Sequence, residues 1–392
     1  MKLLIMSGPL FPNLGNNANL VGKLILYLLE KNHEVRWFSS VFDVDHNKLP
    51  KEILGIPVYW CRDPKDLKRK YLFPLLSKIK DPDGFSDELQ VQIYLRDLER
   101  IQKVYPFEAV VSTSEPYSMA VAASRVEGVQ RILYLMDPPA SVSNGYKTKY
   151  RTNTLGKTLS GQNAIISTPF IFEALQKHGI DLSNVNMIQT GFPMVNDRGL
   201  TSIYQQKKRI RLLFTGWLYS DIRSPEYFLK IVSLLDERFQ VIFMGRECEY
   251  LKERFPINTK AEIITIPQQP YDVALQAMAD ADILINIGNS VPVHMPSKTL
   301  EYINTGKPIV NFYKLEDCPT LYYTKRYPLA LNLYEGDDNI DKAVEQFIEF
   351  CEKTKGQQVN RSYVLEEYKD CTPEYIAELI CDHLKNGFCE VY

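Results

Sequence analysis

The chain has 392 residues, of which 45% are hydrophobic, and its formal net charge at neutral pH is -2. A chain of this length is typical of two or three domains, and its near-neutral charge excludes a general electrostatic attraction to nucleic acid. The seven cysteines show no C-x-x-C or C-x-x-H spacing, which disfavours a disulfide framework and a structural zinc site and favours a reducing compartment. The N-terminal apolar run is too short for a secretory signal, and no stretch approaches the roughly 18 consecutive apolar residues of a membrane span, so we expect a cytoplasmic protein.

In the first half of the chain, short apolar runs alternate with segments of helical spacing. Residues 2–7 predict a strand, a loop rich in Gly, Pro and Asn follows, residues 20–29 predict a helix and residues 34–39 the next strand. Further strands are predicted at 109–112, 131–136, 164–167 and 186–189, and helices at 118–123 and 170–178. This alternation predicts a parallel sheet with right-handed crossovers. Gly8, Gly15 and Gly22 lack the G-x-G-x-x-G spacing of a dinucleotide fingerprint, which disfavours a dehydrogenase.

A polar, basic stretch at 196–211 has the composition of a linker, and the alternation then starts again. The second half predicts strands at 212–214, 240–244, 262–266, 283–287 and 309–312, with helices at 225–235, 247–254, 271–278 and after Pro296. Two more helices are predicted at 340–353 and 373–384. We therefore expect an α/β protein with two Rossmann-like parallel-sheet domains, residues 1–195 and 212–370, that face a cleft. The segment 371–392 is expected to form a C-terminal helix that packs back toward the first domain.

The most informative stretch is residues 295–312, M-P-S-K-T-L-E-Y-I-N-T-G-K-P-I-V-N-F. Ser297 marks the start of a short helix, and Gly306, as a C-cap without Cβ, marks its end. The free backbone N–H groups and the positive dipole end favour an anion at the helix start, and Lys298 adds a positive charge. Glu301 lies one turn further on the same face, where its carboxylate can accept hydrogen bonds from neighbouring hydroxyls such as a ribose diol. The spacing thus favours a nucleotide with a diphosphate, although an amphipathic surface helix explains it equally well.

The residues of this helix carry a resemblance to a known family. P-S-K-T-L-E-Y-I-N-T-G-K-P-I-V at 296–310 is similar to the donor-domain pattern P-x-K-x-x-E-Y-x-x-x-G-K-P-I-V of GT-B fold glycosyltransferases, nearest to the retaining group 1 family. The resemblance implies that Ser297 and Lys298 face the diphosphate of a nucleotide-sugar. It also implies that Glu301 holds the ribose.

A second stretch carries the same resemblance. F-T-G-W-L-Y-S-D-I-R at 214–223 is similar to the loop that opens the donor domain, with Gly216 at the nucleotide-sugar and Arg223 at the diphosphate. The family implies transfer of a sugar from a UDP-, GDP- or dTDP-sugar to an acceptor hydroxyl, with retention of configuration, in polysaccharide or glycoconjugate biosynthesis. Arg223 and Lys298 would then stabilise the leaving diphosphate, so that neither a metal ion nor another cofactor is required.

The first domain offers candidates near the acceptor. Asp137 within L-M-D-P-P resembles an aspartate that some of these enzymes place beside the acceptor hydroxyl and the transferred sugar, and we name it as a catalytic candidate. A loop aspartate that caps backbone amides is an equal alternative. Gly15 offers backbone N–H groups to the ligand, or it only forms a turn. Glu115 and Tyr117 are weaker candidates of the same kind.

Two departures from the family pattern leave alternatives open. Trp217 follows Gly216 where the family often has Arg, and Val293 and His294 stand where it often has a second acidic residue. One alternative is therefore a catalytically inactive GT-B homologue that acts as a binding or partner subunit. The other is a nucleotide-sugar 2-epimerase, which needs acid and base side chains around the sugar.

Two further sequence patterns concern metal binding and membrane contact. Two D-x-D triplets, at 43–45 and 280–282, have the form of a metal-binding motif, but neither lies near the predicted phosphate helix in the sequence, and we interpret both as structural. The basic segment 62–80 predicts a peripheral contact with the inner face of an anionic membrane, or else a solvated charged surface. The expected partners are a nucleotide-sugar donor and a glycan, lipid-linked or small-molecule acceptor, and no nucleic acid.

Overall fold

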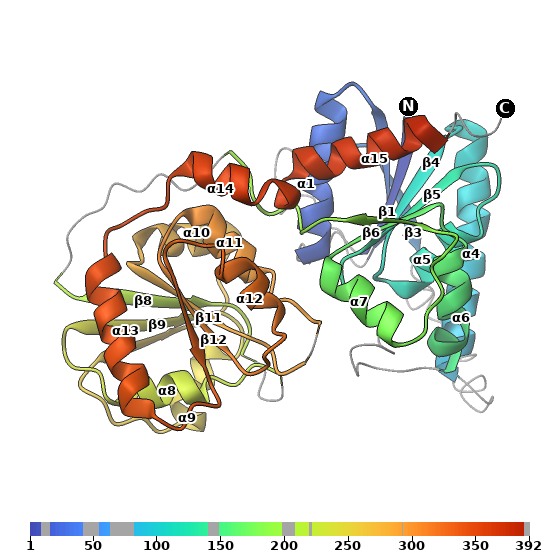
Figure 1. Cartoon of the computed structure of the whole chain (residues 1–392). Helices are drawn as coiled ribbons and strands as arrows, with labels where there is room; N and C mark the ends of the chain where they lie inside the picture. The colour runs from blue at the N-terminus through green and yellow to red at the C-terminus, as the bar shows by residue number, and fades with distance from the viewer. Residues whose placement is uncertain are drawn as a thin grey trace. The chain divides into compact units, whose positions relative to one another are not determined.

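The structure, a computed structural model, describes residues 1–8, 16–41, 55–62, 82–139, 149–197, 208–218, 222–291 and 293–387. The chain divides into two compact units: unit 1 is Met1–Pro193 with Asp370–Tyr392, and unit 2 is Met194–Lys369. Each unit is a parallel sheet with helices packed against it (Figure 1). The predicted α/β class with two parallel sheets is confirmed.

In the described part of unit 1, seven strands form one sheet in the order β3-β2-β1-β4-β5-β6-β7, and all neighbouring strands are parallel. The strands are β1 (Lys2–Ser7), β2 (Glu34–Val41), β3 (Val58–Arg62), β4 (Ala109–Thr113), β5 (Gln130–Leu135), β6 (Ala164–Ser167) and β7 (Asn186–Gln189). The described helices are α1 (Asn16–Glu30), α4 (Pro82–Val104), α5 (Tyr117–Ser124), α6 (Lys149–Ser160), α7 (Pro169–Lys177) and α15 (Pro373–Gly387). Leu3, Leu4 and Ile5 of β1 are at most 1% exposed, as expected for a strand that is covered on both faces.

The C-terminal helix α15 crosses α1 and packs against it within unit 1 (Figure 1). The hydroxyl of Tyr27 donates to Glu378 across this contact (3.4 Å), and the Cys381 thiol lies 3.2 Å from the His33 ring. Burial raises the pKa of the Cys381 thiol. The last helix of the chain is therefore part of the first folded unit.

In the described part of unit 2, six parallel strands follow the order β10-β9-β8-β11-β12-β13. The strands are β8 (Ile210–Thr215), β9 (Phe239–Met244), β10 (Glu262–Ile266), β11 (Ile283–Ile287), β12 (Ile309–Tyr313) and β13 (Ala330–Tyr334). The described helices are α8 (Glu226–Ser233), α9 (Leu251–Arg254), α10 (Tyr271–Asp280), α11 (Lys298–Thr305), α12 (Pro319–Thr324), α13 (Ile340–Thr354) and α14 (Arg361–Glu367). The helix predicted at 247–254 is shorter than expected, because Glu247 has a left-handed φ of 67° and a 3-10 turn precedes α9.

In each sheet the chain first adds strands on one side of the first strand and then on its other side. In unit 1, β1 lies between β2 and β4, and in unit 2, β8 lies between β9 and β11. Such a reversal opens a crevice beyond the carboxyl ends of the two central strands, where α/β proteins bind ligands. The fold therefore predicts ligand sites at the loops that follow β1 and β4, and at those that follow β8 and β11.

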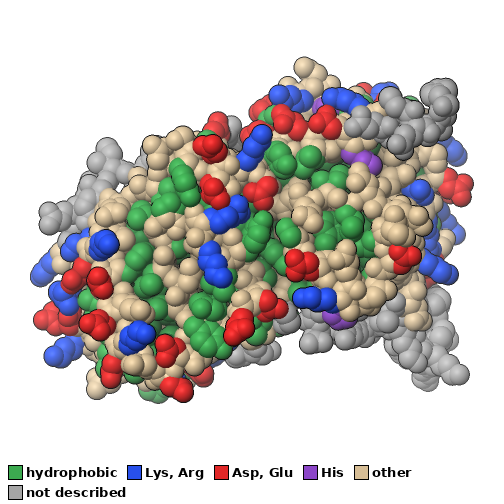
Figure 2. Space-filling model, viewed as in Figure 1, with side chains coloured by type: hydrophobic (Ala, Val, Ile, Leu, Met, Phe, Trp, Pro, Cys, Tyr) green, Lys and Arg blue, Asp and Glu red, His purple; other side chains and the backbone are tan. Residues whose placement is uncertain are grey.

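The surface shows no separation of charge by sign on the face in Figure 2, where acidic and basic side chains are interspersed with apolar ones. Among the described helices, none combines the length and the apolar character needed to cross a bilayer. Gly15, the triplet at 43–45 and residues 63–80 of the basic segment lie outside the described residues.

Candidate functional site

The loops after β8 and β9 touch each other at the carboxyl edge of the unit 2 sheet. Gly216 follows β8 with a φ of 149°, a conformation that favours glycine, and its N–H donates to the carbonyl of Met244 (3.0 Å). Gly245 follows β9 with a φ of 142°, and a Cβ added there would lie 1.9 Å from the carbonyl oxygen of Gly216. Only glycine at position 245 allows this approach.

Helix α11 starts beyond the carboxyl end of β11, which is the strand beside β8. It begins directly after Ser297 and ends at Gly306, whose left-handed φ of 76° is the predicted C-cap. The helix prediction is confirmed, although the Ser297 side chain makes no capping hydrogen bond. Because this helix start lies at the crevice of unit 2, its backbone N–H groups and dipole favour an anion at that place.

Glu301 and Lys298 form an ion pair on the first turn of α11, through the Oε2 atom of the glutamate. The Glu301 side chain is only 6% exposed. Its other oxygen, Oε1, is buried and receives no hydrogen bond of standard geometry from the described residues, although the Tyr271 hydroxyl lies beside the carboxylate. An unpaired buried polar atom costs on the order of 1 to 3 kcal/mol, so this oxygen points to a ligand that donates a hydrogen bond.

Tyr271, the first residue of α10, lies beside this ion pair. The ammonium of Lys298 is 5.9 Å from the centroid of its ring. Burial, together with the nearby carboxylate of Glu301, raises the pKa of the Tyr271 hydroxyl. The hydroxyl therefore stays protonated next to the carboxylate at neutral pH.

Tyr302 attaches α11 to the end of β8. Its hydroxyl accepts a hydrogen bond from the backbone N–H of Thr215 (2.8 Å) and lies 3.0 Å from the Oγ1 atom of the same threonine. The tyrosine is 1% exposed, and burial raises its pKa. Since Thr215 precedes Gly216, these bonds hold the helix start and the glycine loop in a fixed relation.

A ladder of asparagines lies beneath the same helix. Asn286, Asn311 and Asn332 stand in register on β11, β12 and β13. The side-chain amide of Asn286 donates to Asn311 (2.7 Å), and that of Asn311 donates to Asn332 (2.8 Å). The hydroxyl of Thr299, in the first turn of α11, donates to the Oδ1 atom of Asn286 (3.2 Å). Burial shields these bonds from water, so they orient the start of the helix.

Arg223 lies between the ends of β8 and β11. Its Nε and Nη2 atoms both donate to Oδ1 of Asn289 (3.1 and 2.9 Å), and Nη1 donates to the carbonyl of Trp217 (3.4 Å). The Nδ2 atom of Asn289 lies 2.7 Å from Nδ1 of His294. A guanidinium and an amide NH2 group only donate, so Nδ1 of His294 must accept and the ring proton is on Nε2. Arg223 therefore holds the His294 ring in place through Asn289.

Unit 1 contains a pocket of about 30 Å³ at the carboxyl ends of β4 and β5. It is lined by Ser114, Glu115, Tyr117, Ala120, Leu133, Leu135, Asp137, Pro138, Pro139, Arg151, Leu155, Thr158 and Leu159. The walls are apolar, and three charged side chains lie among them. A pocket of this size admits a small group, such as the end of a larger ligand, and not a whole sugar ring.

The charged side chains of this pocket interact. Arg151 lies 3.4 Å from the Glu115 carboxylate and stacks over the ring of Tyr117, 5.4 Å from its centroid. Burial raises the pKa of Glu115, the charge of Arg151 opposes that rise, and the charge of Asp137 adds to it. The backbone N–H of Asp137 donates to the hydroxyl of Ser114 (3.3 Å). Asp137 thus lies beside Glu115 and Tyr117, the weaker candidates of the sequence.

The structure therefore groups the predicted site residues by unit. The carboxyl edge of the unit 2 sheet carries Gly216, Arg223, Ser297, Lys298 and Glu301, and the unit 1 pocket carries Asp137. The sequence interpretation missed Gly245, Asn289 and the role of Tyr302. A signal was present for the tyrosine, which follows Glu301 in the E-Y pair of the family pattern.

Asp282 of the second D-x-D triplet has a structural partner. Its side chain is buried, and its carboxylate accepts a hydrogen bond from the backbone N–H of Arg211 at the start of β8 (2.8 Å). Among the described residues, no three His, Cys, Asp or Glu side chains gather in a way that could hold a metal ion.

Solved structures resemble this chain over nearly its whole length. HepE from Anabaena, in complex with UDP, gives a TM-score of 0.65 at 13% sequence identity, covering 98% of this chain and 100% of the HepE chain. The lipopolysaccharide outer core galactosyltransferase WaaB, in its apo form, gives 0.62 at 12% identity, covering 99% of this chain and 100% of the WaaB chain. The chain has the GT-B fold.

The same fold also occurs in a neighbour with another activity. A UDP-GlcNAc 2-epimerase from Neisseria meningitidis, bound to UDP-GlcNAc, gives a TM-score of 0.59 at 12% identity, covering 98% of this chain and 100% of the epimerase chain. In sequence, the chain matches no protein-family model and no curated protein. Identities this low show a shared fold, so the activity has to be argued from the site.

Proposed function

We propose that this protein is a glycosyltransferase that moves a sugar from a nucleotide-sugar donor to the hydroxyl of an acceptor. The observation that carries the proposal is the arrangement at the start of α11. There, a helix N-terminus and Lys298 suit a diphosphate, and the unpaired Oε1 atom of Glu301 suits a ribose hydroxyl. HepE has been solved with UDP and with UDP-glucose, which supports a uridine nucleotide-sugar as the donor.

Unit 2 would bind the donor and stabilise the leaving group. As the bond between sugar and phosphate breaks, negative charge grows on the diphosphate, and the sugar becomes an oxocarbenium-like cation. The N–H groups of α11, the ammonium of Lys298 and the guanidinium of Arg223 oppose that negative charge, which lowers the barrier. Buried hydrogen bonds hold the start of α11 and Arg223 in place, so little reorganisation is needed when the charge appears.

Unit 1 would hold the acceptor at its pocket. In this proposal Asp137 orients the acceptor hydroxyl, which attacks the sugar from the face that the diphosphate leaves, and the diphosphate takes the proton. This path retains the anomeric configuration without a covalent intermediate on the protein. We further propose that transfer needs no metal ion and that it serves polysaccharide or glycoconjugate biosynthesis.

A 2-epimerase is the second candidate, because an epimerase is among the structural neighbours. Epimerisation at C2 needs groups that remove and return a proton beside the sugar. The His294 ring is linked to Arg223 through Asn289, which places it near the candidate donor site. WaaB, a galactosyltransferase, is also among the structural neighbours, and the start of α11 suits the release of a diphosphate, which makes the transferase the better-supported function.

A panel of nucleotide-sugars separates these functions. The protein is incubated with UDP-glucose, UDP-GlcNAc, GDP-mannose and dTDP-glucose, and the products are followed by NMR of the anomeric protons. A glycosyltransferase releases nucleoside diphosphate, by slow hydrolysis or by transfer to an added acceptor, whereas an epimerase first forms an epimeric nucleotide-sugar. An inactive homologue binds a nucleotide-sugar and leaves it unchanged. If no nucleotide-sugar binds or reacts, the proposal is wrong.

A further inference from the structure

Arg246 and Trp217 form a stacked pair at the edge of the candidate donor site. The guanidinium carbon of Arg246 lies 3.9 Å from the centroid of the Trp217 ring. The two residues follow Gly245 and Gly216, the glycines at which the loops after β9 and β8 touch. The backbone N–H of Leu218 also donates to the carbonyl of Arg246 (3.2 Å). The stack is therefore held by both loops.

Arg246 differs from the other unit 2 arginines that stack on aromatic rings. Arg238, Arg254 and Arg326 each stack on a ring and each also pair with a carboxylate: Asp236 and Glu352, Glu247, and Glu367 respectively. The Arg246 side chain is exposed and makes no ion pair or hydrogen bond with the residues that the structure describes. Its neighbour Glu247, the nearest acid in sequence, is bound to Arg254.

A second arginine, Arg223, also contacts Trp217. Arg223 donates to the carbonyl of Trp217 while Arg246 covers its ring. Arg223 also donates to Asn289. An anion bound beside Trp217 would meet the positive charge of both guanidinium groups.

These cations follow three neighbouring strands of the sheet. Arg246 comes two residues after β9, Arg223 comes after β8, and Lys298 begins the helix after β11, and the strands lie in the order β9-β8-β11. Three cations at this edge of the sheet suit an anion with several charged oxygens better than a single carboxylate.

We propose that Arg246, held on the ring of Trp217, contacts the diphosphate of the donor as a cation of the binding site. The inference rests on the proposed function, because it needs a nucleoside diphosphate at the start of α11. One face of the guanidinium covers the indole, and its N–H groups lie in the ring plane and stay able to donate to phosphate oxygens. Stacking lowers the freedom of a long side chain, so less entropy is lost when the phosphate binds.

The test compares ligands that differ only in phosphate. Uridine, UMP and UDP, and the matching guanosine series, are titrated into the wild-type protein and Arg246→Gln by calorimetry. We expect Arg246→Gln to weaken binding of the diphosphate about tenfold, the lower end of a charge-assisted hydrogen bond, and to leave the nucleoside unchanged. Arg246→Lys keeps the charge and loses the planar fork, so its affinity should fall between the two.

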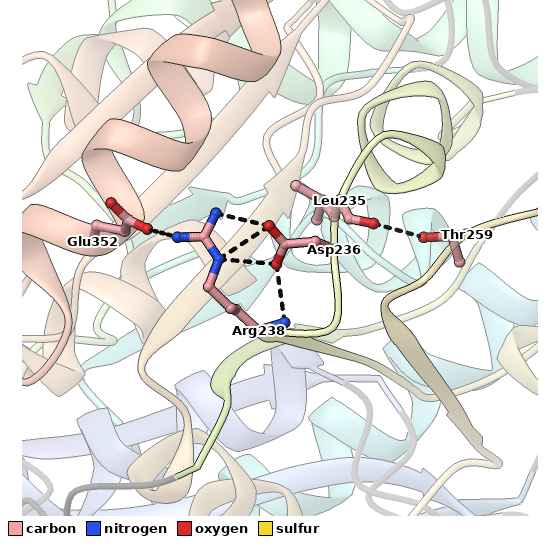
Figure 3. Close-up of polar contacts among 5 residues, drawn as sticks. All are labelled: Leu235, Asp236, Arg238, Thr259 and Glu352. Atoms are coloured by element: carbon pink, nitrogen blue, oxygen red, sulfur yellow. Dashed lines mark hydrogen bonds and ion pairs between the residues drawn. The ribbon is translucent and has the colours of Figure 1, made fainter.

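Arg238→Gln is the matched control. Arg238 lies just before β9, at the end of the strand opposite to Arg246. It stacks on Phe239 and forms ion pairs with Asp236 and Glu352 (Figure 3). Its loss should lower thermal stability without changing nucleotide affinity. Thermal unfolding of each variant shows whether a weakened affinity reflects a damaged fold.

The outcomes separate the inference from the proposed function. If the wild-type protein binds no nucleoside diphosphate, the proposed function fails, and the inference fails with it. If the wild-type protein binds one and folded Arg246→Gln binds it equally well, the inference alone is wrong. An equal loss for nucleoside and diphosphate also overturns it, because a phosphate contact cannot weaken a ligand that has no phosphate.

Discussion

Replacing Glu301 by alanine gives the sharpest test of the donor site. Oε2 of the carboxylate is bound to Lys298, whereas Oε1 receives no hydrogen bond of standard geometry from the described residues, so one new hydrogen bond to a ribose hydroxyl is available. A charge-assisted bond contributes about 1.5 to 3 kcal/mol, so Glu301→Ala should weaken nucleoside diphosphate binding roughly ten- to hundredfold. Sugar transfer should fall at least as far.

The fold should tolerate this change. Removing the carboxylate also removes an unpaired buried oxygen, and the Lys298 ammonium that loses its partner is 24% exposed and can be solvated. Alanine favours the helix, so we expect the free energy of unfolding to change by no more than about 1 kcal/mol. Glu349→Ala, at an exposed position of α13, is the control for a helix-surface change far from the site.

Calorimetric titration with nucleoside and nucleoside diphosphate is the assay. Glu301→Ala should weaken both ligands, because both contain the ribose, whereas Lys298→Ala should weaken only the diphosphate. If folded Glu301→Ala binds the diphosphate as tightly as the wild-type protein, the ribose role is wrong, and the assignment of the donor site loses its main support.

Three other expectations concern pH, metal ions and the unit 1 pocket. Burial raises the pKa of Glu335 to about 6, although the charge of Lys314 opposes the rise. The folded state therefore binds this proton more tightly than the unfolded state, and the free energy of unfolding should fall by up to about 2 kcal/mol as the pH rises from about 4.5 to 6. Glu335→Gln should remove this pH dependence, as measured by urea unfolding. Excess chelator should leave sugar transfer unchanged, since the cations of unit 2 supply the charge for the diphosphate; activity that is lost and then restored by Mn²⁺ or Mg²⁺ would contradict this. Asp137→Asn should lower turnover and leave nucleotide affinity unchanged, because Asp137 belongs to unit 1. An equal loss of nucleotide affinity would contradict a role of Asp137 at the acceptor.

Local signals explain which elements could be predicted. The limits of α11 follow from Ser297, Gly306 and Pro308, which act within one helical turn of their own position. β1 and β11 are short apolar runs covered on both faces, so each reads as a strand without knowledge of its neighbours.

Among the described elements, the sequence interpretation missed β3, β13, α4, α6, α12 and α14, and two of them show why. β3 is a five-residue strand at the edge of its sheet, and α4 is rich in charged residues. Its buried side chains Val91, Tyr94, Leu98 and Ile101 follow a helical spacing of three or four, which a count of apolar residues in a window does not show. The helical spacing of these buried residues was the signal from which α4 could have been predicted.

The contacts of the candidate site depend on strand order, which local patterns do not determine. Arg223 meets Asn289 across 66 positions, and Thr215 meets Tyr302 across 87. Trp217 was interpreted as the loss of a cation from its own loop. Once β9 is placed beside β8, Arg246 brings a guanidinium to that tryptophan, and the sequence alone could not show this neighbour.

The five residues 298–302 explain how so short a helix can contact a ligand and also stay fixed against the sheet. Successive residues turn about 100° around a helix axis, so positions three apart share a face. Thr299 and Tyr302 form one such pair, and both are bound to the sheet, at Asn286 and Thr215. Lys298 and Glu301 form the other pair, one residue earlier and therefore about a quarter turn away. Apolar packing alone would let the helix rotate or slide, but two directional hydrogen bonds on one face fix both motions. The ion pair is thereby presented at a set angle, which is the preorganisation that charge stabilisation at a leaving diphosphate requires.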